Sequence, residues 1–177
     1  QPLTFSQFTA QSSMPSAVLI KGSVGAQPAS HSVNVTQLAQ AQRTVIKGSL
    51  GSPITSGGAM APVGQALQVN LTLQGQTHNL SITNTTPEGV VSAINAAGLG
   101  VTASLVNLTG SQGGALGIVL TGDVGADNAF SIDMPDTSNI TVTQSRSAQD
   151  AELSVDGVEI TRPSNQISDV IQGAVLD

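Results

Sequence analysis

Apolar and polar residues alternate along several short segments of this 177-residue chain, which is the pattern of β-strands with one buried face. The clearest segment is residues 67–73, where leucines and a valine occupy every second position. A second alternating run, residues 78–82, follows after Gly75, so the two runs predict a β-hairpin. Further alternating runs predict strands at residues 32–37, 101–105, 116–120 and 130–134.

One helix is predicted between these strands. Thr86 can cap its N-terminus, Pro87 suits the first helical position, and Glu88 favours the positive end of the helix dipole. Gly98 can end the helix. The residues expected to face the sheet are Val90, Val91 and Ile94.

The C-terminal segment predicts a second hairpin. Residues 153–155 and 158–160 are strand-like, and Asp156 and Gly157 suit a two-residue turn in which both residues have positive φ. Because an isolated two-stranded hairpin is marginally stable, we expect it to pair with an earlier strand such as residues 32–37. The residues after the hairpin show a short helix-like pattern.

Two segments interrupt the strand patterns. Phe5 and Phe8 are at helical spacing, and Pro15 disfavours a helix just before it, which predicts the last turn of a helix leaving a longer stalk. Residues 48–64 gather glycine, serine and proline without periodicity, which is typical of a flexible linker. We therefore place a domain boundary near Pro62.

A hexapeptide occurs twice, as IKGSVG at residues 20–25 and as IKGSLG at residues 46–51. The copies are either equivalent strand-and-turn pieces of one sheet or a coincidence in a chain with 19 glycines. Two copies of six residues do not establish a solenoid. The sequence supports the two interpretations equally.

The composition favours a mainly β protein and excludes several kinds of chemistry. An apolar content of 39% in 177 residues can form one sizeable core or two small ones. The absence of Cys excludes disulfides, thiolate chemistry and cysteine-based zinc sites, and the absence of Trp and Tyr excludes stacking platforms made of these residues. No apolar run approaches the roughly 20 residues that span a bilayer, and the N-terminus lacks a secretory signal pattern.

The net charge of −6 is unevenly distributed. Glu88 is the one acidic residue before residue 120, so the acidity lies in the last third of the chain. Five lysines and arginines cannot form the basic surface that binds a phosphate backbone, which argues against nucleic-acid binding. The acidic surface is expected to favour solubility and repulsion between copies.

The two histidines are weak candidates for a metal site. His78 shares the parity of Leu80 and Ile82, which favours a partly buried structural imidazole, and His31 has no acidic neighbour close in sequence. Two histidines without cysteines bind zinc only if carboxylates complete the ligand set. We therefore expect no metal residues.

Two acidic pairs, Asp123 with Asp127 and Asp133 with Asp136, are candidates for a glycosidase, and the loop TGDVGADNAFSID (residues 121–133) has oxygen ligands for calcium. Their glycine- and proline-rich surroundings favour solvated loops, and the spacing is not that of an EF-hand. No Gly-x-Ser-x-Gly motif is present for nucleophilic catalysis. We assign no catalytic, cofactor-binding or metal-binding residue, and no cofactor.

Resemblance to a known family covers nearly the whole chain. SVNVTQLAQAQ (residues 32–42) and AELSVDGVEITRPSNQISDVIQGAVLD (residues 151–177) resemble the bacterial flagellar filament cap protein, also called hook-associated protein 2. The module at residues 67–132, which contains INAAGLGVTASLVN, resembles a repeat found in several flagellar axial proteins and is less specific. FTAQSSMPSAV (residues 8–18) resembles the exit from that family's helical leg into its head. The family's terminal heptad-bearing segments are absent, so we expect a head-region fragment without the coiled-coil segments.

This resemblance implies a mainly β fold (β-rich α+β) of two small domains, one inserted into the other. Each domain would be a small antiparallel sheet with at most one short helix. Residues 1–62 and 147–177 would form a discontinuous head domain, and residues 63–146 would form the inserted domain that contains the flagellin-type repeat.

The implied role is structural. The chain would be the head of a homo-oligomeric, ring-shaped cap at the distal filament end, which promotes insertion and folding of exported flagellin and prevents its loss. Its partners would be flagellin and other copies of the full-length protein, with host surface glycans left open, and without nucleic acid or membrane insertion. Its location would be extracellular, after transport by the flagellar export apparatus without a cleaved signal peptide.

Two other function classes remain open from the residues alone. An extracellular adhesin or carbohydrate-binding module would share the β architecture, although sugar sites usually use an aromatic platform and this chain has only three Phe as aromatic residues. A glycosidase that uses Asp133 and Asp136 is the weaker alternative.

Overall fold

The computed structural model describes residues 9–23, 26–110 and 114–177 of the chain. The expected helical turn at Phe5 and Phe8 lies outside these ranges. Contacts between residues divide the chain into two compact units. The first unit joins Gln1–Ala39 to Asp150–Asp177, and the second is Gln40–Gln149.

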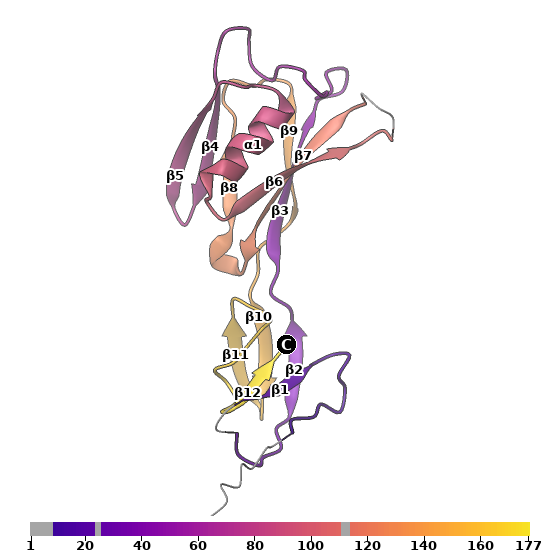
Figure 1. Ribbon diagram of the computed structural model, residues 1–177, viewed down its shortest axis with the longest axis vertical. Coiled ribbons are helices and arrows are strands. Elements are labelled where there is room, and N and C mark those ends of the chain that lie inside the picture. The colour runs from indigo at the N-terminus through magenta and orange to yellow at the C-terminus, as the bar shows by residue number, and fades with distance from the viewer. Residues whose placement is uncertain (1–8, 24–25, 111–113) are drawn as a thin grey trace, which may run out of the picture. The chain divides into compact units, whose positions relative to one another are not determined.

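The first unit contains two small antiparallel sheets (Figure 1). One sheet has the strand order β11-β10-β2, and the other pairs β1 with β12. The strands are β1 (Ile20–Gly22), β2 (Val33–Gln37), β10 (Ala151–Val155), β11 (Val158–Arg162) and β12 (Ala174–Leu176). The core cluster of this unit consists of Leu153, Val155 and Leu176 from these strands together with Ile167 from the segment between β11 and β12.

The predicted C-terminal hairpin is confirmed. β10 and β11 pair in antiparallel orientation, and the two turn residues, Asp156 and Gly157, have φ angles of 51° and 85°. Both angles are positive, as the expected two-residue turn requires. β10 also pairs with β2, so the expected docking of the hairpin on residues 32–37 is confirmed.

The prediction of a helix-like segment after the hairpin is wrong. Residues 163–173 form turns and bends around a single bridge at Ile167. The backbone of Ile167 exchanges hydrogen bonds of 2.9 and 2.8 Å with the backbone of Leu176, and both side chains are buried in the core. This pairing satisfies backbone groups that a helix would otherwise have satisfied.

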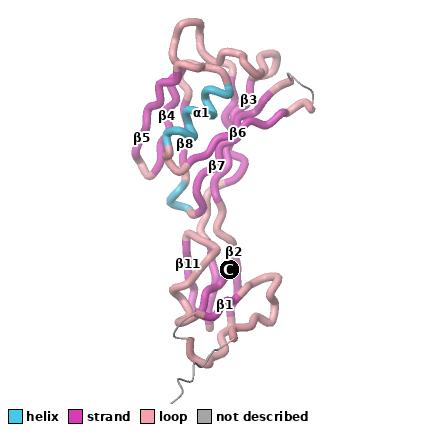
Figure 2. The backbone as a smooth tube through the Cα atoms, viewed as in Figure 1, coloured by secondary structure: helices cyan, strands magenta, loops and turns pink. Residues whose placement is uncertain are grey.

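The second unit contains a four-stranded sheet of order β6-β7-β3-β9 and a three-stranded sheet of order β5-β4-β8. Helix α1 packs against β6 and β5, and one long loop joins β3 to β4 (Figures 1 and 2). The elements are β3 (Ala41–Gly48), β4 (Leu67–Leu73), β5 (Gln76–Ile82), α1 (Pro87–Ala97), β6 (Val101–Asn107), β7 (Leu116–Val124), a 3-10 turn (Ala126–Asn128), β8 (Phe130–Asp133) and β9 (Ile140–Arg146).

The first hairpin and the helix are confirmed. β4 and β5 pair along their whole length. The hydroxyl of Thr86 accepts a hydrogen bond of 3.2 Å from the Gly89 backbone N–H, and Gly98 ends α1 with a φ of 62°. Val90 and Ile94 are completely buried, so the predicted face of the helix packs on the core.

The predicted domain boundary near Pro62 is wrong. Residues Ala41–Gly48 form β3, which pairs with β7 on one side and with β9 on the other. Residues 40–62 and 147–149 therefore belong to the second unit, and the boundaries lie after Ala39 and before Asp150. The strand pattern of β3 is hidden in the sequence because two polar residues, Gln42 and Thr44, occupy buried positions.

The expectation of a mainly β protein with small antiparallel sheets and one short α-helix is confirmed for the described residues. The two copies of the IKGS repeat lie in different sheets, one in β1 and the other at the end of β3. The interpretation of these copies as equivalent pieces of one sheet is therefore wrong.

Candidate functional site

The carboxylates of Asp133 and Asp136 make polar contacts beside β4. Asp133 accepts a hydrogen bond of 3.4 Å from the side-chain amide of Asn70, and Asp136 accepts one of 3.4 Å from the backbone N–H of Gln68. Both aspartates are exposed. Both carboxylates therefore lie open to solvent, and neither is enclosed in the kind of apolar pocket that holds the general acid of a glycosidase.

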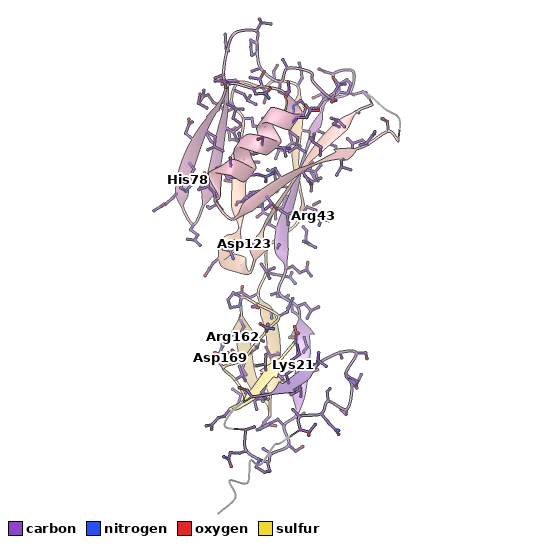
Figure 3. The ribbon with its side chains drawn as sticks, viewed as in Figure 1. Lys21, Arg43, His78, Asp123, Arg162 and Asp169 are labelled. Atoms are coloured by element: carbon purple, nitrogen blue, oxygen red, sulfur yellow. The ribbon has the colours of Figure 1, made fainter. Side chains whose placement is uncertain are left out.

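A hollow of about 250 Å³ brings together two residues that the sequence did not connect. His78 from β5 and Asp123 from β7, which are labelled in Figure 3, both line it, whereas Asp127 does not. Its full lining consists of Leu73, Gln74, Gln76, His78, Leu99, Gly100, Asp123 and Asn128. The lining can offer hydrogen bonds and includes two leucines, but it contains no Phe, Tyr or Trp side chain.

The described ranges contain no group of three or more His, Cys, Asp or Glu side chains that could hold a metal ion. The same ranges contain no helix with the length and apolar character needed to cross a membrane.

His31 and Asp156 form a side-chain hydrogen bond in the first unit. The Nδ1 atom of His31 lies 2.8 Å from one Asp156 carboxylate oxygen, and the backbone N–H of Ser32 donates to the other at 2.8 Å. Because a carboxylate only accepts, the imidazole Nδ1–H must be the donor. The hydrogen bond from His31 is the main reason that the pKa of Asp156 is lowered from its ordinary value.

Three amide side chains each bind both backbone groups of one other residue. Gln42 pairs with Phe130 at 2.6 and 3.0 Å, Asn95 with Ala103 at 3.0 and 2.7 Å, and Asn165 with Ala39 at 3.1 and 2.7 Å. Gln42 and Asn165 have partners 88 and 126 positions away in the sequence, so no local pattern identifies these two amides. They fix strands in place and leave those backbone groups unavailable to other chains.

The connecting loop, residues 49–66, joins β3 to β4 and is held to the second unit at several points. The carboxylate of Glu88 at the start of α1 accepts hydrogen bonds from the Ser56 hydroxyl at 2.6 Å and from the Gly57 N–H at 3.2 Å. The bond from Ser56 is the main reason that the pKa of Glu88 is lowered. Ile54 is buried in the core of the unit.

Two aliphatic side chains of the connecting loop are fully exposed, namely Leu50 and Val63. Leu50 lies in the turn closed by the Ser49–Ser52 bridge, and Val63 lies in the turn between Pro62 and Gln65. Exposed aliphatic residues at turn tips differ from the usual polar turn chemistry. The loop therefore presents apolar contact points on an anchored backbone.

Comparison with known proteins agrees with this description. The family model for the N-terminus of flagellar hook-associated protein 2 matches residues 1–42. No curated protein sequence matches the chain.

Solved structures match the fold over most of the chain. The D1-D2-D3 domains of the flagellar cap protein FliD from Escherichia coli superpose with a TM-score of 0.75 and 27% identity, covering 91% of this chain and 50% of that chain. The D2-D3 domains of the same protein superpose with a TM-score of 0.74 and 25% identity, covering 91% of this chain and 86% of that chain. The FliD D2-D3 domains from Serratia marcescens superpose with a TM-score of 0.73 and 26% identity, covering 91% of this chain and 92% of that chain. This chain thus spans half of the three-domain structure, and its resemblance to the cap protein family is confirmed.

Proposed function

We propose that this chain is the head region of a flagellar filament cap protein and has a structural role at the distal end of the filament. The observation that carries the proposal is the fold match to the cap protein's D2-D3 domains over 91% of the chain. The match of residues 1–42 to the hook-associated protein 2 family supports the same conclusion from the sequence.

In this role the chain acts through its surfaces. The full-length protein would form a homo-oligomeric ring, under which exported flagellin subunits fold and insert. The anchored connecting loop, with exposed Leu50 and Val63, is the surface of the second unit best suited to contact such a partner. Export through the flagellar apparatus, without a cleaved signal peptide, is part of the same proposal.

An adhesin or carbohydrate-binding function is not favoured. The hollow beside His78 and Asp123 lacks the aromatic platform that sugar rings stack on. A glycosidase is likewise unsupported, since Asp133 and Asp136 are exposed surface carboxylates.

Deletion of the full-length parent gene tests the proposal. We expect the mutant to lose its filaments and to release monomeric flagellin into the medium, measured by immunoblotting of the culture supernatant. The full-length parent should restore filaments, whereas this chain alone should not. Normal filaments in the deletion strain would contradict the proposal.

A further inference from the structure

We propose that the open edge of β9 is a self-association surface, which pairs with β9 of a second copy in antiparallel orientation. Self-pairing of this edge would be a property of the chain beyond the proposed cap function.

β9 is an edge strand that leaves backbone groups unpaired. It pairs with β3 on one side only. The Ser49 backbone N–H donates to the carbonyl of Asn139 at 2.8 Å, which fixes the alternation of hydrogen bonds along the β3–β9 ladder. In the register that starts at Gly48 opposite Ile140, the backbone groups of Thr141 and Thr143 face β3.

The backbone N–H and C=O groups of Ile140, Val142 and Gln144 therefore point away from β3. Within the described ranges, no backbone group from outside the ladder bonds to them. Three outward N–H and C=O pairs in one extended segment form a template for another strand.

The side chains of β9 do not protect this edge. Its central five residues, 141–145, are exposed, so neither face of the strand is covered. The sequence ITVTQSR has a β-branched run, no proline and no lysine, and its one charge, Arg146, lies at the end. Soluble proteins usually protect a long edge strand with charges, proline or a covering element. An unprotected edge of this kind indicates a pairing surface.

The opposite edge of the same sheet shows the protection that β9 lacks. α1 packs against β6, and the side-chain amide of Asn95 occupies both backbone groups of Ala103 in that strand. The protein therefore blocks one edge of the sheet and leaves the other open.

A second copy of β9 is the occupant that the chemistry favours. An antiparallel pair centred on Val142 places this side chain opposite Val142 of the second copy and Thr141 opposite Thr143 of the second copy. The 41% exposed valine would thereby gain an apolar neighbour. The two Arg146 residues would lie at opposite ends, so no like charges would meet.

Such a pair leaves no free sheet edge for a third copy. It joins two four-stranded sheets edge to edge, and both outer edges are then β6, where Asn95 blocks further pairing. A two-fold contact produces dimers and cannot itself produce a cyclic ring. The pairing therefore describes free subunits or two facing assemblies, and the contacts within a ring must use other surfaces.

The contact is expected to be weak. One strand pair buries less than the roughly 1,200 Å² of total surface that stable, specific interfaces bury. The pairing should therefore be reversible and detectable mainly by a method that traps it.

Disulfide trapping provides that method, because the natural chain has no cysteine. Val142→Cys would place one thiol opposite its copy at the two-fold axis, within the Cα separation that a disulfide accepts. The matched control is Val158→Cys, on the edge strand β11 of the first unit, where the valine is 64% exposed. Random collision alone would favour the more exposed control.

We expect Val142→Cys to form covalent dimers about tenfold faster than Val158→Cys under the same mild oxidant, since pairing raises the local thiol concentration. Adding Gln144→Pro to Val142→Cys should remove this advantage while the melting temperature stays close to that of Val142→Cys. The outward N–H of Gln144 is not needed by β3, so proline blocks only the partner strand.

Equal dimerisation rates for the two cysteine variants would overturn the proposal. An advantage that survives Gln144→Pro would also overturn it, because the contact would then not be strand pairing. Preferential trapping of added flagellin by Val142→Cys, without self-crosslinking, would assign the edge to a different occupant and overturn self-pairing.

Discussion

The Nδ1 atom of His31 lies 2.8 Å from a carboxylate oxygen of Asp156, and this contact joins residues 125 positions apart in the sequence. Asp156 is also the first residue of the β10–β11 turn, and its backbone N–H donates to the carbonyl of Ser32 at 2.9 Å. One turn residue thus closes the C-terminal hairpin and binds the start of β2. The C-terminal hairpin thereby completes a unit that begins in the N-terminal segment.

Asp156→Asn should lower stability at neutral pH but not in acid. The pKa of Asp156 is lowered in the folded chain, mainly by the hydrogen bond from His31 and then by that from Ser32. Its contribution is therefore present above the ordinary value of 3.8 and is lost as the pH falls through the lower folded pKa. Asparagine tolerates the positive φ of this position, so the substitution tests the charge.

The measurement is the melting temperature of the natural chain and of Asp156→Asn from neutral pH down to about pH 2.5, below the ordinary pKa of aspartate. The difference between them should close as the pH falls. Glu159→Gln, which removes a charge from the same hairpin, is the control. A difference that stays constant or widens in acid would contradict the assignment.

Gly157→Val should destabilise the chain by roughly 1–3 kcal/mol, because a β-branched residue would have to adopt a strained positive φ. Gly157 has a φ of 85°, and an added Cβ would meet nothing within 4 Å, so the loss would come from the backbone conformation alone. Gly157→Asn should lose less, since asparagine accepts this region of φ. Chemical denaturation checks both variants, and equal losses would argue against backbone strain.

Gln42→Ala should destabilise the second unit by roughly 2–4 kcal/mol, because it leaves the N–H and C=O of buried Phe130 without partners. Gln42 itself is 3% exposed. Gln144→Ala, an exposed substitution in β9, should change stability by less than about 0.5 kcal/mol. Urea unfolding curves compare the two, and a loss for Gln42→Ala no larger than for Gln144→Ala would show that water replaces the amide.

The chain should be monomeric or only weakly associated in solution. No segment carries the repeated apolar heptads of a coiled coil, and the acidic last third repels its copies at low salt. Light scattering across a concentration series checks this expectation. A stable closed ring at micromolar concentration would show that the head itself carries the assembly interface.

Local patterns predicted the elements whose signals lie within a few residues. The alternation in Leu67–Leu73 and the capping residues Thr86 and Gly98 specified β4 and α1 because turn and cap chemistry act over short distances. β3 was missed because Gln42 and Thr44 are buried polar residues, and the partner of Gln42, Phe130, is far away in the sequence. For the same reason the boundary near Pro62 was wrong.

The residues of the candidate site also could not be paired from local sequence patterns. His78 and Asp123 were each recognised as notable, but only the folded second unit brings them to one hollow. The His31–Asp156 contact also depends on topology, since neither residue has an oppositely charged neighbour nearby in the chain. Sequence patterns could suggest these groups but could not pair them.

Immunogold electron microscopy of flagella from the source bacterium tests the central claim most directly. Antibodies raised against this chain would be located on intact filaments. The proposed cap function predicts one gold cluster at the distal end of each filament. Label along the shaft, label only at the base, or intact unlabelled tips would contradict it.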